Sequence, residues 1–127
     1  MQRRAPASVG RDRVLEADLL TAIDRTAPTP HGYGFGASVQ MRLDRGDRLR
    51  GNAFAARDVP GLLGEAIEEA EDLPAWAVLA FTQAVRSGAD PSSLDTLRQA
   101  IVIAACSAAH AHFKLREAVA AWERVQR

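Results

Sequence analysis

Cysteine is almost absent from this chain, because Cys106 is the only one among 127 residues. A single cysteine cannot form an internal disulfide, so a fold held together by disulfides is excluded. Cys106 lies in an apolar run, where a buried and unreactive thiol is the usual state of cysteine. The chain therefore has to depend on an ordinary hydrophobic core, for which 127 residues are sufficient.

Long apolar runs and an apolar leader are also missing. No stretch approaches the roughly 20 apolar residues that span a bilayer. Arg3 and Arg4 are not followed by the apolar core of a signal peptide. These absences favour a cytoplasmic protein that has no membrane partner.

Lysine is scarce, since Lys114 stands beside fifteen arginines, a bias typical of GC-rich bacterial coding. Hydrophobic residues make up 47% and charged residues 25%, as in ordinary soluble domains. The net charge is zero but unevenly placed. Residues 1–57 hold ten arginines against six acids, and residues 58–127 hold six basic residues against ten acids. Two halves of one fold, or two copies of the chain, could complement each other.

Motifs for catalysis and for cofactor binding are lacking. Gly32–Gly36 is the only glycine-rich segment, but it precedes an expected strand, whereas a phosphate loop lies between a strand and a helix. Cys106, His110 and Glu117 can share one helix face, which is half of a metal site by spacing. A histidine beside a buried thiol explains the same pattern. We therefore assign no catalytic residue, metal or cofactor.

The first half of the chain predicts one helix and one β-hairpin. Residues 1–10 are expected to form a flexible tail, and residues 11–127 a single domain. Apolar residues recur at helical spacing over 11–25. Apolar and polar residues then alternate from Ala37 to Asp44, which is strand periodicity. A turn at Gly46 would return the chain as a second strand over 48–56.

The second half predicts three helices. Asp58 is a good N-cap for a helix that ends near Asp72. Pro74 is expected to close that helix and to open another, over 75–87, which is apolar around most of its surface and should be largely buried. Asp90 caps a long final helix. The predicted fold class is therefore α+β, with the element order α-β-β-α-α-α.

The final helix carries an unbroken heptad pattern of apolar residues. Such a pattern places a continuous stripe on one helix face and is typical of helix association. Neither proline nor glycine interrupts it. One seam position reads Leu94, Ile101, Ala108, Leu115 and Trp122, and the other reads Leu97, Ala104, Ala111, Ala118 and Val125.

These patterns favour a small non-enzymatic protein-interaction or regulatory module that forms a homodimer. A lone hairpin leaves two open strand edges, and a second copy would cover them. The heptad seam would hold the assembly. A protein partner of unknown identity would bind the exposed charged surfaces.

Two alternatives stay open at this point. A nucleic-acid-binding regulator would use the Arg-rich hairpin, with Arg42, Arg48 and Arg50 on its outward face. Neighbouring acids, Asp44 and Asp47, reduce the positive charge there. The second alternative is a small enzyme or ligand-binding protein whose site lies near the Gly32–Gly36 loop.

Overall fold

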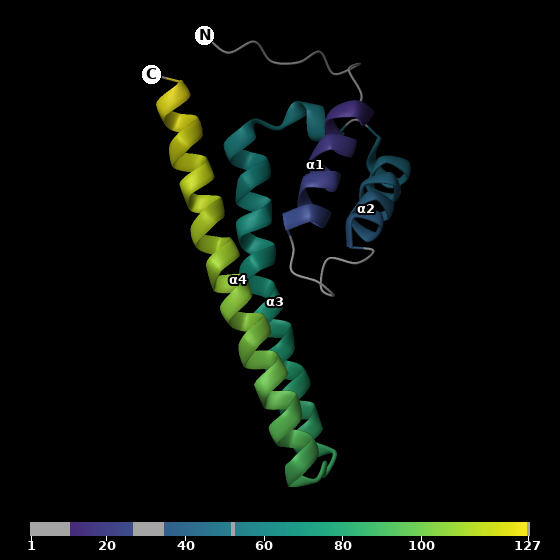
Figure 1. Ribbon diagram of the computed structural model, residues 1–127, viewed down its shortest axis with the longest axis vertical. Coiled ribbons are helices and arrows are strands. Elements are labelled where there is room, and N and C mark those ends of the chain that lie inside the picture. The colour runs from purple at the N-terminus through teal and green to yellow at the C-terminus, as the bar shows by residue number, and fades with distance from the viewer. Residues whose placement is uncertain (1–10, 27–34, 52, 127) are drawn as a thin grey trace. The chain divides into compact units, whose positions relative to one another are not determined.

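A computed structural model describes residues 11–26, 35–51 and 53–126, so the expected tail over 1–10 lies outside the described residues. Helices make up 90% of these residues, and no strand occurs among them. The elements are α1 (Arg13–Thr26), α2 (Phe35–Arg50), the short 3-10 helix η1 (Ala53–Ala56), α3 (Val59–Arg86) and α4 (Pro91–Val125) (Figure 1).

The chain divides into two compact units at the point where its charge changes sign. One unit spans residues 3–57 and holds α1, α2 and η1, while the other holds α3 and α4. The boundary at Arg57 is also where the arginine-rich half of the sequence ends and the acidic half begins.

The predicted β-hairpin is wrong, and with it the α+β fold class. Residues 37–44 and 48–50 belong to α2, and Ala53–Ala56 form η1. Strong helix formers, including Gln40, Met41 and Arg42, outnumber the single β-branched residue in 37–44, so helix propensity outweighs the alternation. The left-handed glycine that ends this helix is Gly51, with a φ of 57°. Gly46, the expected turn residue, lies inside α2.

The second correction concerns Pro74. α3 runs from Val59 to Arg86 through this proline, so the two helices predicted over 58–72 and 75–87 are one. Proline removes a backbone N–H and crowds the preceding turn, but it does not have to end a helix whose other residues are stabilised by packing. The predicted caps are confirmed. The Asp58 carboxylate accepts from the Gly61 N–H at 2.8 Å, and the Asp90 carboxylate accepts from the Ser93 N–H at 3.0 Å.

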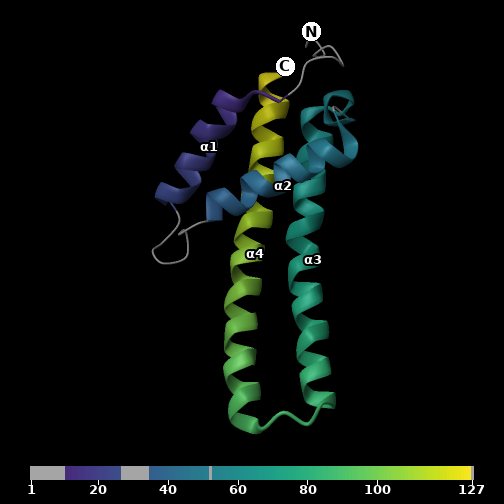
Figure 2. The same ribbon diagram turned by 90° about the vertical axis from the view of Figure 1, so that its right-hand side faces the viewer.

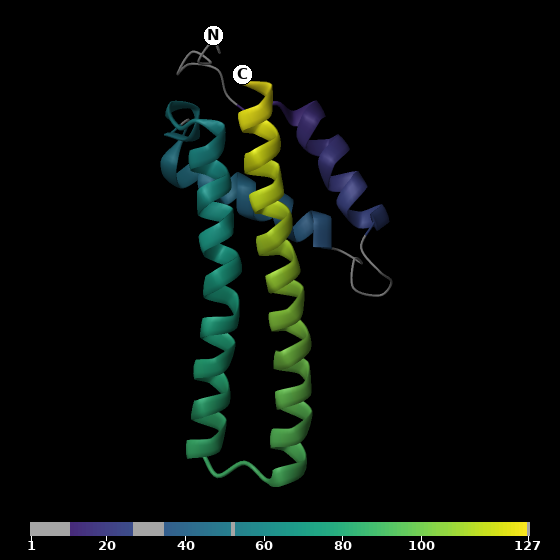
Figure 3. The same ribbon diagram turned by 90° about the vertical axis from the view of Figure 1, so that its left-hand side faces the viewer.

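Helices α3 and α4 form a long antiparallel hairpin. They lie side by side along their length in all three views (Figures 1, 2 and 3). A short turn joins them, and Gly88 takes the left-handed conformation in it, with a φ of 76°. The half-buried residues of α4 mark the line that faces α3, and Ala108 on this line is only 6% exposed. No other residue of α3 or α4 is buried.

Candidate functional site

The heptad seam of α4 is split between the inside and the outside of the hairpin. All five residues of the first seam position are buried or half-buried: Leu94, Ile101, Ala108, Leu115 and Trp122. In the second position only Leu97 is half-buried, and the other four are exposed: Ala104, Ala111, Ala118 and Val125. One half of the predicted seam thus packs α4 on α3, while the other half lies on the outer surface of this unit.

Large apolar side chains are exposed on α3 as well. The expectation that residues 75–87 would be largely buried is wrong, because Trp76 is 71% exposed and Val78, Leu79 and Val85 are exposed too. A pair of helices can bury only one stripe of each member. A helix that is apolar around most of its circumference therefore keeps apolar surface that its single neighbour does not cover.

A contact between the helices identifies the two faces of the hairpin. The Nε2 atom of His112 lies 2.9 Å from Oε1 of Glu71. Both residues lie on the same side of the line along which α3 and α4 meet. Counting 100° per residue, Val102 and Phe113 of α4 and Val78 of α3 fall on this side, which we call the Phe113 face.

The opposite side of the hairpin is the Trp76 face. On α3 it holds Leu73 and Trp76, which are turned by about 200° and 140° from Glu71. On α4 it holds the exposed alanines of the second seam position. Bulky residues therefore line one helix of this face, and small residues line the other.

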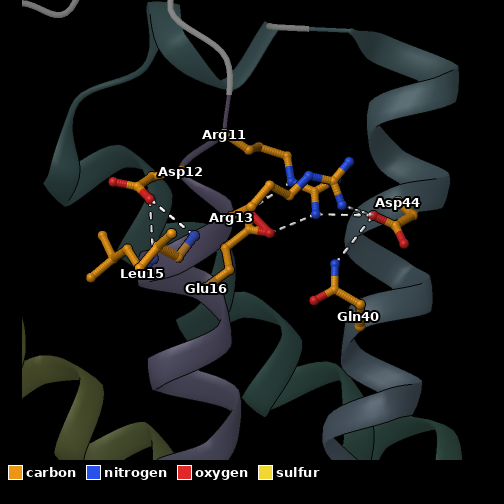
Figure 4. A network of polar contacts seen from close by, with 8 residues as sticks. Arg11, Asp12, Arg13, Leu15, Glu16, Gln40 and Asp44 are labelled. Carbon is orange, nitrogen blue, oxygen red and sulfur yellow. Dashed lines mark hydrogen bonds and ion pairs between the residues drawn. The ribbon is translucent and has the colours of Figure 1, made fainter.

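The α1–α2 unit contains a network of charged side chains (Figure 4). Arg11 donates to both carboxylate oxygens of Glu16, at 2.7 and 2.6 Å, and to Asp44 of α2 at 3.0 Å. Arg13 and Gln40 also donate to Asp44, at 3.0 and 3.2 Å. The Arg11 side chain is 8% exposed. The network ties the start of α1 to the middle of α2, which points to a structural role.

Hydrogen bonding to Arg11 lowers the pKa of both Glu16 and Asp44. A carboxyl group with a lowered pKa stabilises the fold above its ordinary pKa, and the stabilisation is lost as the pH falls through the pKa of the folded state. We therefore expect α1 and α2 to separate in acid. Asp44→Asn should weaken their contact at pH 7 and should match the wild-type chain at a pH where Asp44 is protonated. Amide NMR signals of α2, followed from pH 7 into acid, measure this.

Asp18→Asn is the matched control, because Asp18 is an exposed residue of α1. It should leave the α2 signals unchanged at pH 7. Equal spectra for the Asp44 and Asp18 variants at that pH would contradict a structural role for the network.

A second contact joins α1 to the first turn of α2. The Asp24 carboxylate accepts a hydrogen bond from the Gly36 N–H at 2.8 Å. A Cβ atom at Gly36 would lie 2.5 Å from the Asp24 carboxylate, so any other residue at this position would force that side chain to move and would disturb the hydrogen bond. The last glycine of the Gly32–Gly36 segment therefore serves helix packing. His31, Tyr33 and the rest of the segment up to residue 34 lie outside the described residues.

The residues considered for metal binding are exposed on α4. Cys106, which was expected to be buried, is exposed, as are His110 and Glu117. Lys114 donates to Glu117 at 3.1 Å. No group of three or more metal-binding side chains occurs among the described residues.

The arginines considered for nucleic-acid contact lie on a helix instead of a hairpin. Arg42 and Arg48 are exposed, and six residues of helix turn one by about 120° from the other. Arg50 is the last residue of α2, and its side chain lies outside the described part. The outward hairpin face that would have brought the three together does not exist.

Within the described part of the chain, none of the helices combines the length and apolarity that crossing a membrane requires. Comparisons with protein families, with curated proteins and with solved structures gave no match.

Proposed function

We propose that this chain is a protein-interaction module whose binding surface is the exposed apolar surface of the α3–α4 hairpin. One observation carries the proposal. Ala108 is the only buried residue of the two helices, whereas Trp76 is 71% and Phe113 is 59% exposed. Soluble chains rarely leave apolar surface of this extent uncovered unless it binds a partner.

The energetics support this role. Covering a large apolar side chain is worth about 1.5–3 kcal/mol. Each face of the hairpin carries such side chains, so covering one face offsets part of the entropy lost on association. Aromatic residues such as Trp76 are also the type most enriched at interface hot spots. The binding needs no catalytic group, cofactor or metal.

Trp76 allows the proposal to be tested in the full chain. The only other tryptophan is Trp122, so Trp122→Phe leaves Trp76 as a unique fluorophore. We expect its emission to lie at long wavelength, as for a solvated indole, whenever the sample has the mass of one chain. The emission should move to shorter wavelength when the chain is assembled. Fluorescence and light scattering on the same samples measure both. Short-wavelength emission from a single chain would mean that other residues of the same chain cover Trp76, which would overturn the proposal.

A further inference from the structure

The Trp76 face is complementary to itself, and this follows from the register of the hairpin. Glu71 contacts His112, and α3 and α4 are antiparallel. A residue that follows Glu71 in α3 by a given number of positions therefore lies opposite the residue that precedes His112 in α4 by the same number. Trp76 is therefore level with Ser107, and Leu73 is nearly level with Ala111. Bulky residues on one helix lie at the same height as small residues on the other.

Two residues of opposite charge, Glu69 of α3 and Lys114 of α4, also correspond to each other in this register. Glu69 lies seven residues before Trp76, two helical turns along the same edge of α3. Lys114 lies seven residues after Ser107 on the corresponding edge of α4. These two residues are therefore level with each other, and both are exposed. They have opposite charge, and they lie at the two outer edges of one face.

We infer that the Trp76 face binds a second copy of this chain, face to face, across a two-fold axis parallel to the helices. This operation places α3 of one chain against the partner's α4 at the same height. Trp76 then packs on the partner's Ser107, and Leu73 packs on the partner's Ala111. Glu69 faces the partner's Lys114. Two hairpins joined in this way form a four-helix bundle with antiparallel neighbours.

This arrangement uses the half of the heptad seam that the single chain leaves exposed. Ala104, Ala111 and Ala118 let the partner's α3 approach closely, and the bulky residues of that α3 fill the space. The inference rests on the proposed function, and it names the partner as this same chain.

The Phe113 face is less suited to the same operation. Phe113 is nearly level with Ala70 and Glu71, so a two-fold axis would bring it toward the acidic stretch of the partner's α3. On this side the stretch carries Glu71, with Glu68 turned by about 60° from it. An aromatic ring next to these carboxylates gains less from burial than Trp76 does on the small residues of the partner's α4. Steric fit therefore favours the Trp76 face.

Sedimentation of the full chain tests the inference with matched variants. The wild-type chain should sediment as a dimer. Trp76→Glu should raise the dimer Kd by about a hundredfold, as expected for loss of a hot spot. Phe113→Glu, an equivalent change on the opposite face, should leave the Kd unchanged. Both side chains are exposed in the single chain, and circular dichroism should show unchanged helicity for both variants.

A charge swap tests the register. Glu69→Lys should raise the Kd about tenfold, because it places like charges opposite each other. Adding Lys114→Glu should restore the wild-type Kd. A double variant that binds no better than Glu69→Lys would overturn this two-fold arrangement, as would a dimer that Phe113→Glu disrupts and Trp76→Glu does not.

The failure of this inference differs from the failure of the proposed function. A wild-type chain that stays monomeric, with Trp76 emitting at long wavelength, would overturn the second copy as the partner. The open apolar surface would still support binding to another protein. A monomer in which Trp76 emits at short wavelength would overturn both.

Discussion

Replacing Ala108 with glutamate should unfold the α3–α4 hairpin. Ala108 is 6% exposed at the middle of the helix pair, so the new carboxylate would lose its water without gaining a partner. Burial of an unpaired charge in a packed interface is among the most costly single substitutions, and we expect a loss of about 3 kcal/mol or more. Urea denaturation followed by circular dichroism measures the free energy of unfolding.

The neighbouring alanine provides the control. Ala109 is exposed on the same helix, and Ala109→Glu adds the same charge and the same helix propensity one residue further along. It should change the free energy of unfolding by less than about 0.5 kcal/mol. Equal losses for the two variants would show that α3 does not pack on the Ala108 side of α4.

Replacing Pro74 with alanine should stabilise the hairpin by about 1–3 kcal/mol. Pro74 lies inside α3, where it removes a backbone hydrogen bond and crowds the preceding turn. Alanine restores the bond and is about 3 kcal/mol more favourable than proline in a helix interior. Repacking of the half-buried site offsets part of this gain. Thermal unfolding of the full chain measures the difference.

Pro91→Ala is the matched control for this prediction. Pro91 is the first residue of α4, where the backbone N–H would have no helical partner and proline is well tolerated. This variant should change stability by less than about 0.5 kcal/mol. If Pro74→Ala had as little effect as Pro91→Ala, Pro74 would be a helix boundary, and α3 would not be continuous.

The sequence predicts the helix boundaries best where capping chemistry is strong. Asp58 and Asp90 accept hydrogen bonds from the first turns of α3 and α4, as their positions indicate. The last third of the chain is also helical as predicted, because its heptad pattern continues over many turns without proline or glycine. Periodicity over such a length leaves no competing structure.

The β-hairpin was predicted wrongly because a short alternating pattern is weak evidence. Four alternations between Ala37 and Asp44 fit a strand, but the same residues fit a helix when propensity is counted. Contacts distant in sequence also stabilise α2. Arg11 and Arg13 bond to Asp44, and these pairings cannot be read from spacing alone.

The sequence alone identified only part of the candidate surface. The heptad pattern identifies both seam positions of α4, but it does not show which of them packs within the chain. That distinction depends on the single neighbour α3, whose length depends in turn on the continuity at Pro74. Trp76 was expected in the core because apolar residues around a whole helix usually indicate burial. In this unit they are exposed, and the proposed assembly would cover them.

The measurement that tests this account most directly is the mass of the wild-type chain in solution, by light scattering at low and at high salt. The account predicts the mass of two chains at both salt concentrations, because apolar contacts hold the assembly and salt screens only its charged edges. The mass of one chain at both would contradict it. Dissociation at high salt alone would also contradict it, since the assembly would then depend on charge instead of the Trp76 face.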